Sequence, residues 1–280
     1  MRHATMNVLL PIAITIAVPA VAAGQAREAG QGMTEGQAAA VLLDDRDSPD
    51  VWRAIGLAVE LGPRAGQELR AAVIEAAWAG VRREAAARAG VVPAGETDGD
   101  LLFMLFEAAE ALRDTRAIPL MIEALKYGGA YDALADLGVA AFPAVLATAN
   151  DPGLHPYRVS GGLTVLRFMV EDGSLGPRQV EQVRETARER LSGTQDPFFI
   201  DDAVRLALAL GDPELRRTVE RIAADRAYAE TLVSRHWEDG TEASVDHHAQ
   251  AVDRVQARAR LFLSGGGGDI GPLRRPSSPW

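Results

Sequence analysis

Helix-breaking residues divide this chain at short intervals, and their spacing constrains the fold more than any other feature of the sequence. Between the breaks, alanine, leucine, arginine and glutamate dominate, and these residues favour the α-helix. Long stretches of alternating apolar and polar residues, which would indicate strands, are absent. The pattern predicts an all-α fold of helices of about 10 to 18 residues joined by short turns. The breaks lie at Pro49, 62–63, 90–99, Pro119, 128–129, Gly138, 151–153, 173–177, 196–197 and 211–213.

Similar helix ends recur along the chain. Leu-Gly pairs at 61–62, 137–138 and 210–211 each close a segment rich in alanine and leucine, and a new helix start follows each pair. The pairs are 76 and 73 residues apart, close to twice a period of about 37 residues. Recurrence of this kind is typical of stacked helical repeats, which bury their apolar faces only against neighbouring repeats.

Three segments carry a family resemblance: LRDTRAIPLMIEAL at 112–125, ALADLGVAAFPAVL at 133–146 and LALALGDPELRRTV at 206–219. They resemble HEAT repeats, in the variant described as the HEAT-like repeats of phycobilisome lyases. The segment at 48–76 fits a fourth copy, and the resemblance covers about 48–225. It implies an irregular HEAT-like α-solenoid of about four to five helix pairs. Irregularity is expected because unit lengths vary and the inserts break the register.

Individual helices give sharper expectations. The helix expected at 101–112 is apolar over most of its circumference, so neighbouring helices should cover it on more than one side. Pro119 falls in the first turn of the next helix, where its missing N–H is not needed. We expect the array to end in a longer helix at 245–263.

The first 26 residues have the composition of a secretory signal peptide. A short start with Arg2 precedes an almost wholly apolar run at 8–23, and small residues follow it. We expect cleavage near Ala22 to Ala26. An uncleaved membrane anchor is the alternative, but the apolar run is shorter than the roughly 20 residues that a spanning helix needs. We therefore expect no stable membrane insertion after cleavage, and a periplasmic or secreted protein.

The rest of the chain divides by composition. Residues 27–34 are polar and read as a flexible lead-in, 35–264 as the HEAT-like helical repeat domain, and 265–280 as a disordered tail with consecutive glycines and several prolines. Lys126 is the only lysine beside many arginines, a bias that indicates a high-GC bacterial genome.

Charge and cysteine content exclude several classes of function. The 280 residues carry a formal net charge of −10, which argues against a general nucleic-acid binder. The chain has no cysteine, so disulfides, thiolate zinc sites and cysteine nucleophiles are excluded.

The histidines and acids do not form a convincing catalytic or metal-binding pattern. Neighbouring His247 and His248 point about 100° apart on a helix, so we expect solvated or capping roles for them and for His236. His155 reads as a turn residue. The acidic clusters at 44–47 and 201–202 read as solvated caps at helix boundaries.

The remaining conspicuous residues also have simple structural interpretations. The glycines at 161–162 and 265–268 lack the strand that a phosphate loop requires, and the first pair reads as a helix interior. Arginines interleaved with glutamates, such as the local basic patch at 82–83, indicate exposed helix surface with ion pairs, and a patch that binds an acidic partner is the alternative. Trp52 and Trp78 are expected in the core, and Trp237 is the expected exposed aromatic.

The sequence thus predicts a non-enzymatic protein–protein interaction scaffold or adaptor in the bacterial cell envelope, with no catalytic residue, cofactor or metal. The alternative is a lyase-like or small-molecule-binding HEAT-like protein. The resemblance implies that the second helix of each pair lines a groove. It nominates six residues for contact with an unknown protein partner: Gln67, Arg70, Glu123, Lys126, Arg216 and Glu220.

Overall fold

The computed structural model describes residues 32–44, 48–91, 99–151, 153–235 and 244–265. The expected signal peptide lies outside the described residues, as do most of the lead-in and residues 266–280 of the tail. His236 and Trp237 also lie outside them.

The expectation of an all-α chain is confirmed. Within the described ranges the structure contains 13 α-helices and no strand, with one isolated bridge between Gln195 and Val233. Short 3-10 turns η1 (Gly62–Arg64), η3 (Thr115–Ala117), η4 (Leu125–Tyr127) and η5 (Gly138–Ala140) join some of the helices. The α-helices are α2 (Glu35–Asp44), α3 (Val51–Leu61), α4 (Gln67–Arg88), α5 (Gly99–Leu112), α6 (Ile118–Ala124), α7 (Tyr131–Asp136), α8 (Phe142–Asn150), α9 (Pro156–Glu171), α10 (Pro177–Arg190), α11 (Pro197–Ala209), α12 (Pro213–Ala224), α13 (Arg226–Leu232) and α14 (Val245–Leu263).

Helix ends coincide with the breakers that the sequence shows. Gly62 and Gly211 adopt positive φ, a conformation that glycine reaches without the steric cost of a Cβ, directly after α3 and two residues after α11. The Asp212 carboxylate then accepts hydrogen bonds from two backbone N–H groups of α12, at 2.8 and 3.1 Å. The expected terminal helix at 245–263 is confirmed. The expected length range is wrong at both extremes, because α4 has 22 residues and α7 only six.

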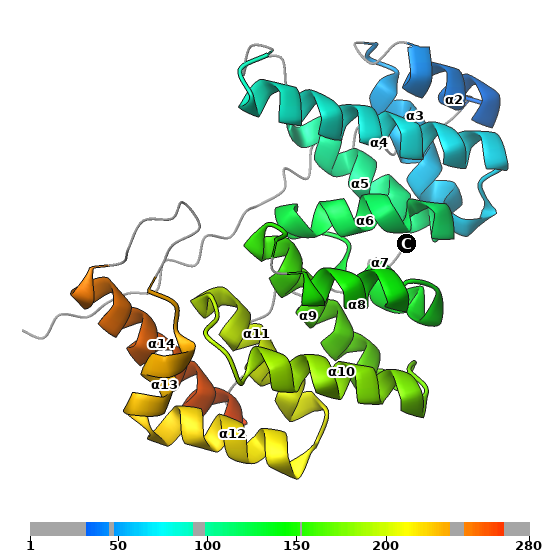
Figure 1. Cartoon of the computed structure of the whole chain (residues 1–280). Helices are drawn as coiled ribbons and strands as arrows, with labels where there is room; N and C mark the ends of the chain where they lie inside the picture. Colours follow the sequence, from blue (N-terminus) through cyan, green and yellow to red (C-terminus); the bar gives the residue numbers. More distant parts are fainter. Residues whose placement is uncertain (1–31, 45–47, 92–98, 152, 236–243, 266–280) are drawn as a thin grey trace, which may run out of the picture.

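The helices follow one another along the molecule in chain order, from α2 at one end to α12, α13 and α14 at the other (Figure 1). Two rows of neighbouring helices can be traced. In one row α4 contacts α6, α6 contacts α8 and α8 contacts α10. In the other row α7 contacts α9, α9 contacts α11 and α11 contacts α14. Contacts of α8 with α9 and of α10 with α11 join the rows.

Two helices occupy central positions in the packing. As expected from its apolar circumference, α5 contacts α3, α4 and α6. Every residue of α9 from 161 to 169 is buried. Gly162 lets α9 approach α8 closely, since a Cβ there would lie 3.0 Å from the backbone nitrogen of Ala149. The expectation that 160–162 forms a helix interior is confirmed.

The hydrophobic core is continuous from Ala38 in α2 to Ala259 in α14 and consists mainly of alanine, leucine and valine. Small side chains allow the helices to pack closely, so few aromatic residues are needed. No described helix combines the length and the apolar character that crossing a membrane requires.

Candidate functional site

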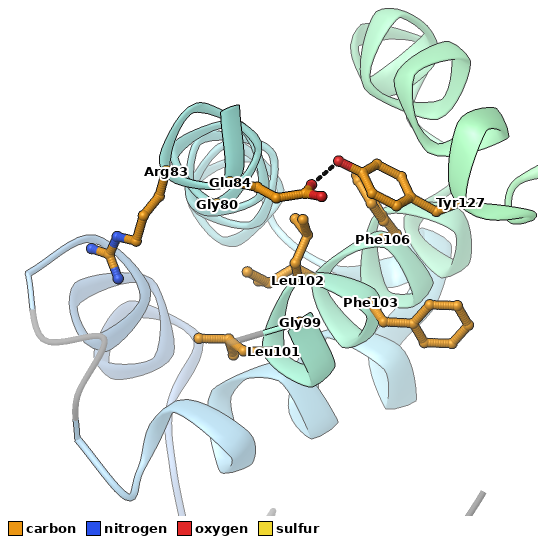
Figure 2. Close-up of a pocket in the computed structure, with 10 residues that line it drawn as sticks. Gly80, Arg83, Glu84, Gly99, Leu101, Leu102, Phe103, Phe106 and Tyr127 are labelled. Atoms are coloured by element: carbon orange, nitrogen blue, oxygen red, sulfur yellow. Dashed lines mark hydrogen bonds between the residues drawn. The ribbon is translucent and has the colours of Figure 1, made fainter. Parts of the chain in front are cut away.

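A cavity of about 230 Å³ lies between α4 and α5, beside the turn η4 (Figure 2). We call it the α4–α5 pocket. Gly80 helps to form it, because a Cβ at this position would lie only 2.9 Å from the Cδ1 of Leu102. The lining residues are Gly80, Arg83, Glu84, Gly99, Leu101, Leu102, Phe103, Leu105, Phe106 and Tyr127.

Most of the pocket wall is apolar and part of it reaches the surface. Leu102, Leu105 and Phe106 are buried, whereas Phe103 is 40% exposed. The rings of Phe106 and Tyr127 pack at a centroid separation of 5.4 Å. The wall therefore offers an apolar side chain a surface to contact without unfolding any helix.

The polar groups of the pocket stand on two sides (Figure 2). On one side the Tyr127 hydroxyl donates a hydrogen bond to Glu84, whose carboxylate also forms an ion pair with Arg88 at 2.5 Å. On the other side Arg83 is exposed, and it has no hydrogen bond or ion pair within the described part of the chain. The carboxylate on one side of the apolar wall thus has two partners, while the guanidinium on the other side has none among the described residues.

A second group of charges lies next to the pocket. Glu123 of α6 forms ion pairs with Lys126 of η4 and with Arg158 of α9, and all three side chains are at least four-fifths buried. Partial burial lowers the pKa of Lys126, and the charge of Arg88 acts in the same direction, while Glu84 opposes it. The Lys126 ammonium also lies 4.7 Å from the centroid of the Tyr127 ring. This cluster ties α6 to α9 and connects with the pocket through Tyr127.

The structure brings Glu123 and Lys126 together, but the other nominated residues lie elsewhere. Gln67 is exposed at the first position of α4. Arg70, one turn later, donates to the carbonyl oxygens of Ala65 at 2.7 Å and Leu112 at 3.4 Å. Those bonds join the turn before α4 to the end of α5, so Arg70 has a structural role in this fold.

Arg216 and Glu220 lie on α12, at the far end of the array. Their side chains form an i,i+4 ion pair at 3.2 Å and are 57% and 52% exposed. This pair matches the expectation of exposed helix surface with interleaved charges. The surface at α12 is separate from the α4–α5 pocket.

The interpretation of Asp201 and Asp202 as solvated helix caps is wrong. Both lie inside α11, five and six positions along the chain from Asp196. Asp202 accepts hydrogen bonds from the hydroxyl groups of Ser160 and Thr164 on α9, the second at 3.3 Å. The reason is tertiary: α9 packs on α11 and binds Asp202, while Asp201 faces Arg258 of α14.

Burial changes the titration of this acid pair. It raises the pKa of Asp201 to about 6, an effect that Arg258, 3.5 Å away on α14, partly opposes. Burial also raises the pKa of Asp202, against the hydrogen bond from Ser160. Tyr131 of α7 has its pKa raised to about 12, first by burial and then by the charge of Asp202. The pair belongs to the interface of α11 with α9 and α14 and is partly exposed there, with 27% of the Asp201 side chain accessible.

Histidines and tryptophans depart from the expectations in three places. His248 is buried rather than solvated, with its Nε2 3.1 Å from the carbonyl oxygen of Val233. His155 caps α9, where its Nδ1 accepts from the backbone N–H of Tyr157 at 3.3 Å. Trp52 is 37% exposed, contrary to a core position, while Trp78 packs partly buried against the core. Among the described residues no group of three or more acids and histidines could hold a metal ion.

Sequence reasoning missed Arg83, Tyr127 and Arg158 as site residues. Each occurs in a helical segment with ordinary composition, and only contacts between α4, η4 and α9 distinguish it. The set that results offers apolar contact, one hydrogen-bonded phenol and one available guanidinium, which is chemistry suited to recognition. No family model, no curated protein and no solved structure matches this chain.

Proposed function

We propose that this protein is a non-enzymatic interaction scaffold whose α4–α5 pocket receives an apolar anchor side chain of a partner protein. The observation that carries the proposal is the pocket itself, an apolar cavity open to the surface beside the exposed ring of Phe103. Binding energy at protein interfaces concentrates in a few anchors that fill such pockets, surrounded by contacts that exclude water.

The size of the pocket favours a side chain over an enclosed small molecule. Pockets for drug-sized ligands occupy about 300–1,000 Å³. The cavity here measures about 230 Å³, below that range. A single leucine or phenylalanine side chain has a volume of the right order for this cavity. The rest of the partner would lie across the neighbouring helices.

The arrangement of the helices supports the wider part of the proposal. Helices that contact their successors in two connected rows are what an irregular HEAT-like α-solenoid of four to five pairs requires. In such an array one row of helices makes the contacts with a partner. Of the six nominated residues, Glu123 and Lys126 lie beside the pocket, and we propose that their ion-pair cluster holds the helices around the contact surface in place.

We place this scaffold in the bacterial cell envelope, as a periplasmic or secreted protein. The support is the composition of the first 26 residues, a charged start followed by a short apolar run and small residues. A protein partner in the same compartment is then the expected ligand.

The test is a pull-down from a bacterial envelope extract with the full chain and two matched variants. Phe103→Ala removes the exposed aromatic beside the pocket, and Tyr157→Ala removes one that is 51% exposed on α9. We expect one protein to be captured by the wild type and by Tyr157→Ala, and to be lost with Phe103→Ala.

Two outcomes contradict the proposal. Capture that is equal for all three proteins would place the contact surface away from the pocket. A small molecule that copurifies with the wild type and is lost with Phe103→Ala, with no protein captured, would favour the small-molecule-binding alternative. Native mass spectrometry of the purified chain detects such a molecule.

A further inference from the structure

Arg83 differs from the neighbouring arginines of α4 because it has no acidic partner among the residues that the structure describes. Arg82 forms an ion pair with Glu75 at 2.7 Å, and Arg88 forms one with Glu84 at 2.5 Å. Arg83 lines the α4–α5 pocket and forms neither an ion pair nor a hydrogen bond with any residue that the structure describes. None of the guanidinium donors is occupied by a described residue.

The acid of the pocket cannot serve Arg83. Glu84 is held on the opposite side by Tyr127 and Arg88 (Figure 2). The adjoining cluster places one acid, Glu123, between two cations. Asp100 follows the lining residue Gly99 and is exposed, without lining the pocket. The pocket and its neighbouring cluster thus carry an excess of positive charge on a chain whose net charge is −10.

We propose that the pocket recognises a peptide segment in which an apolar side chain of leucine or phenylalanine size lies within a few residues of an acidic one. The inference rests on the proposed function and adds the chemistry of the partner. The apolar side chain enters the cavity between α4 and α5, and the carboxylate pairs with Arg83. A guanidinium binds a carboxylate through two parallel hydrogen bonds, which gives this pair direction as well as charge.

The experiment uses short synthetic peptides as probes and the isotope-labelled full chain. Each peptide has a central leucine in a glycine-serine background, flanked by glutamate, by alanine or by lysine. Dissociation constants come from chemical-shift titrations, which detect weak binding. We expect the glutamate peptide to bind about fivefold more tightly than the alanine peptide, the effect of roughly 1 kcal/mol from a partly exposed ion pair. The lysine peptide should bind most weakly.

Charge reversal provides the decisive comparison. With Arg83→Glu the order of the peptides should invert, so that the lysine peptide binds best. Arg217→Glu is the matched control, because Arg217 is also an exposed helical arginine without an ion pair or hydrogen bond among the described residues. This control should keep the wild-type order, and circular dichroism shows whether both variants fold.

The outcomes separate the two proposals. If the leucine peptides bind in a Phe103-dependent manner with no preference for glutamate, the inference about Arg83 is wrong and the proposed function stands. If Arg83→Glu keeps the wild-type order, the inference is likewise overturned. If none of the peptides binds at millimolar concentration, the pocket is not a peptide site and both proposals fail.

Discussion

The α4–α5 pocket and the interface of α9 with α11 and α14 use similar side chains in opposite ways. In the pocket an apolar wall reaches the surface, and the charged groups Arg83 and Glu84 stand at its sides. In the α9–α11 interface Asp202 accepts hydrogen bonds from Ser160 and Thr164 of α9, and Asp201 lies 3.5 Å from Arg258 of α14. In the first region Arg83 has no partner among the described residues, whereas in the second both acids have partners within the fold.

The difference shows why exposed and enclosed charges have different energetic consequences. Water solvates a charge at the surface, so a charged group that has no partner there costs the fold little stability. A carboxylate packed between helices loses water, and hydrogen bonds and nearby cations compensate for this in part, as Ser160 and Arg205 do for Asp202.

The largest expected effect concerns the apolar residues of the two regions. Leu166 on α9 is fully buried, so Leu166→Ala should lower the free energy of unfolding by about 2–5 kcal/mol. Phe103 on α5 is 40% exposed, and Phe103→Ala should lower it by less than about 1 kcal/mol. Urea denaturation measures both. Equal losses would mean that the Phe103 side chain is part of the core. That result would contradict its proposed role beside a binding pocket.

The second prediction concerns pH. Burial raises the pKa of Asp201 to about 6 in the fold, above the ordinary value of 3.8. The folded state therefore holds this proton more tightly than the unfolded chain, so the contribution to stability falls as the pH rises from about 4 to 6. Asp201→Asn removes that loss. We expect it to raise the free energy of unfolding at pH 7 by about 1–3 kcal/mol, with a smaller difference toward pH 4.

The charged groups around Asp201 limit the size of this gain. Arg258 and Arg254 of α14 and Arg205 of α11 favour its ionised form, whereas Asp202 disfavours it. Asp253→Asn is the control, since Asp253 lies on α14 with 62% of its side chain exposed. Urea denaturation at several pH values compares the two variants. A stability difference for Asp201→Asn that does not change with pH would contradict the account of its burial.

The third prediction concerns the hydrogen bond at the pocket. Tyr127→Phe removes the hydroxyl that binds Glu84 and keeps the ring that packs on Phe106. Because Glu84 retains Arg88 as a partner, we expect a loss of only about 0.5–1.5 kcal/mol in thermal or urea unfolding. A loss above about 3 kcal/mol would contradict this account, because it would mean that Arg88 does not compensate Glu84 for the lost hydroxyl.

The smallest expected effect is at α12. Arg216→Ala removes one side of an exposed ion pair, and it should change the free energy of unfolding by less than about 0.5 kcal/mol. Arg70→Ala, which breaks bonds to the three backbone carbonyls of Ala65, Leu112 and Pro63, is expected to cost more. The contrast in urea midpoints separates a surface residue from a structural one. Similar effects for both would remove the distinction between these two nominated arginines.

The sequence was informative about helices and less informative about the site. The breakers and caps act through local backbone geometry, so the ends of α3, α12 and α14 followed from Gly62, Asp212 and the composition of 245–263. Glu123 and Lys126 were nominated, and the structure places them together. Arg158, which completes that cluster, and Tyr127, which joins it to the pocket, were missed because their partners lie on other helices.

The sequence by itself determined the all-α class and most helix boundaries, because helix propensity, glycine conformation and capping depend on neighbours within a few residues. Only the tertiary structure decided which polar groups are enclosed and where a cavity remains. Asp202 is bound by Ser160 and Thr164, about forty positions earlier in the chain, and Gly80 shapes a pocket only where Leu102 packs beside it. Burial depends on contacts between distant segments, and so do the charge state and accessibility of a site.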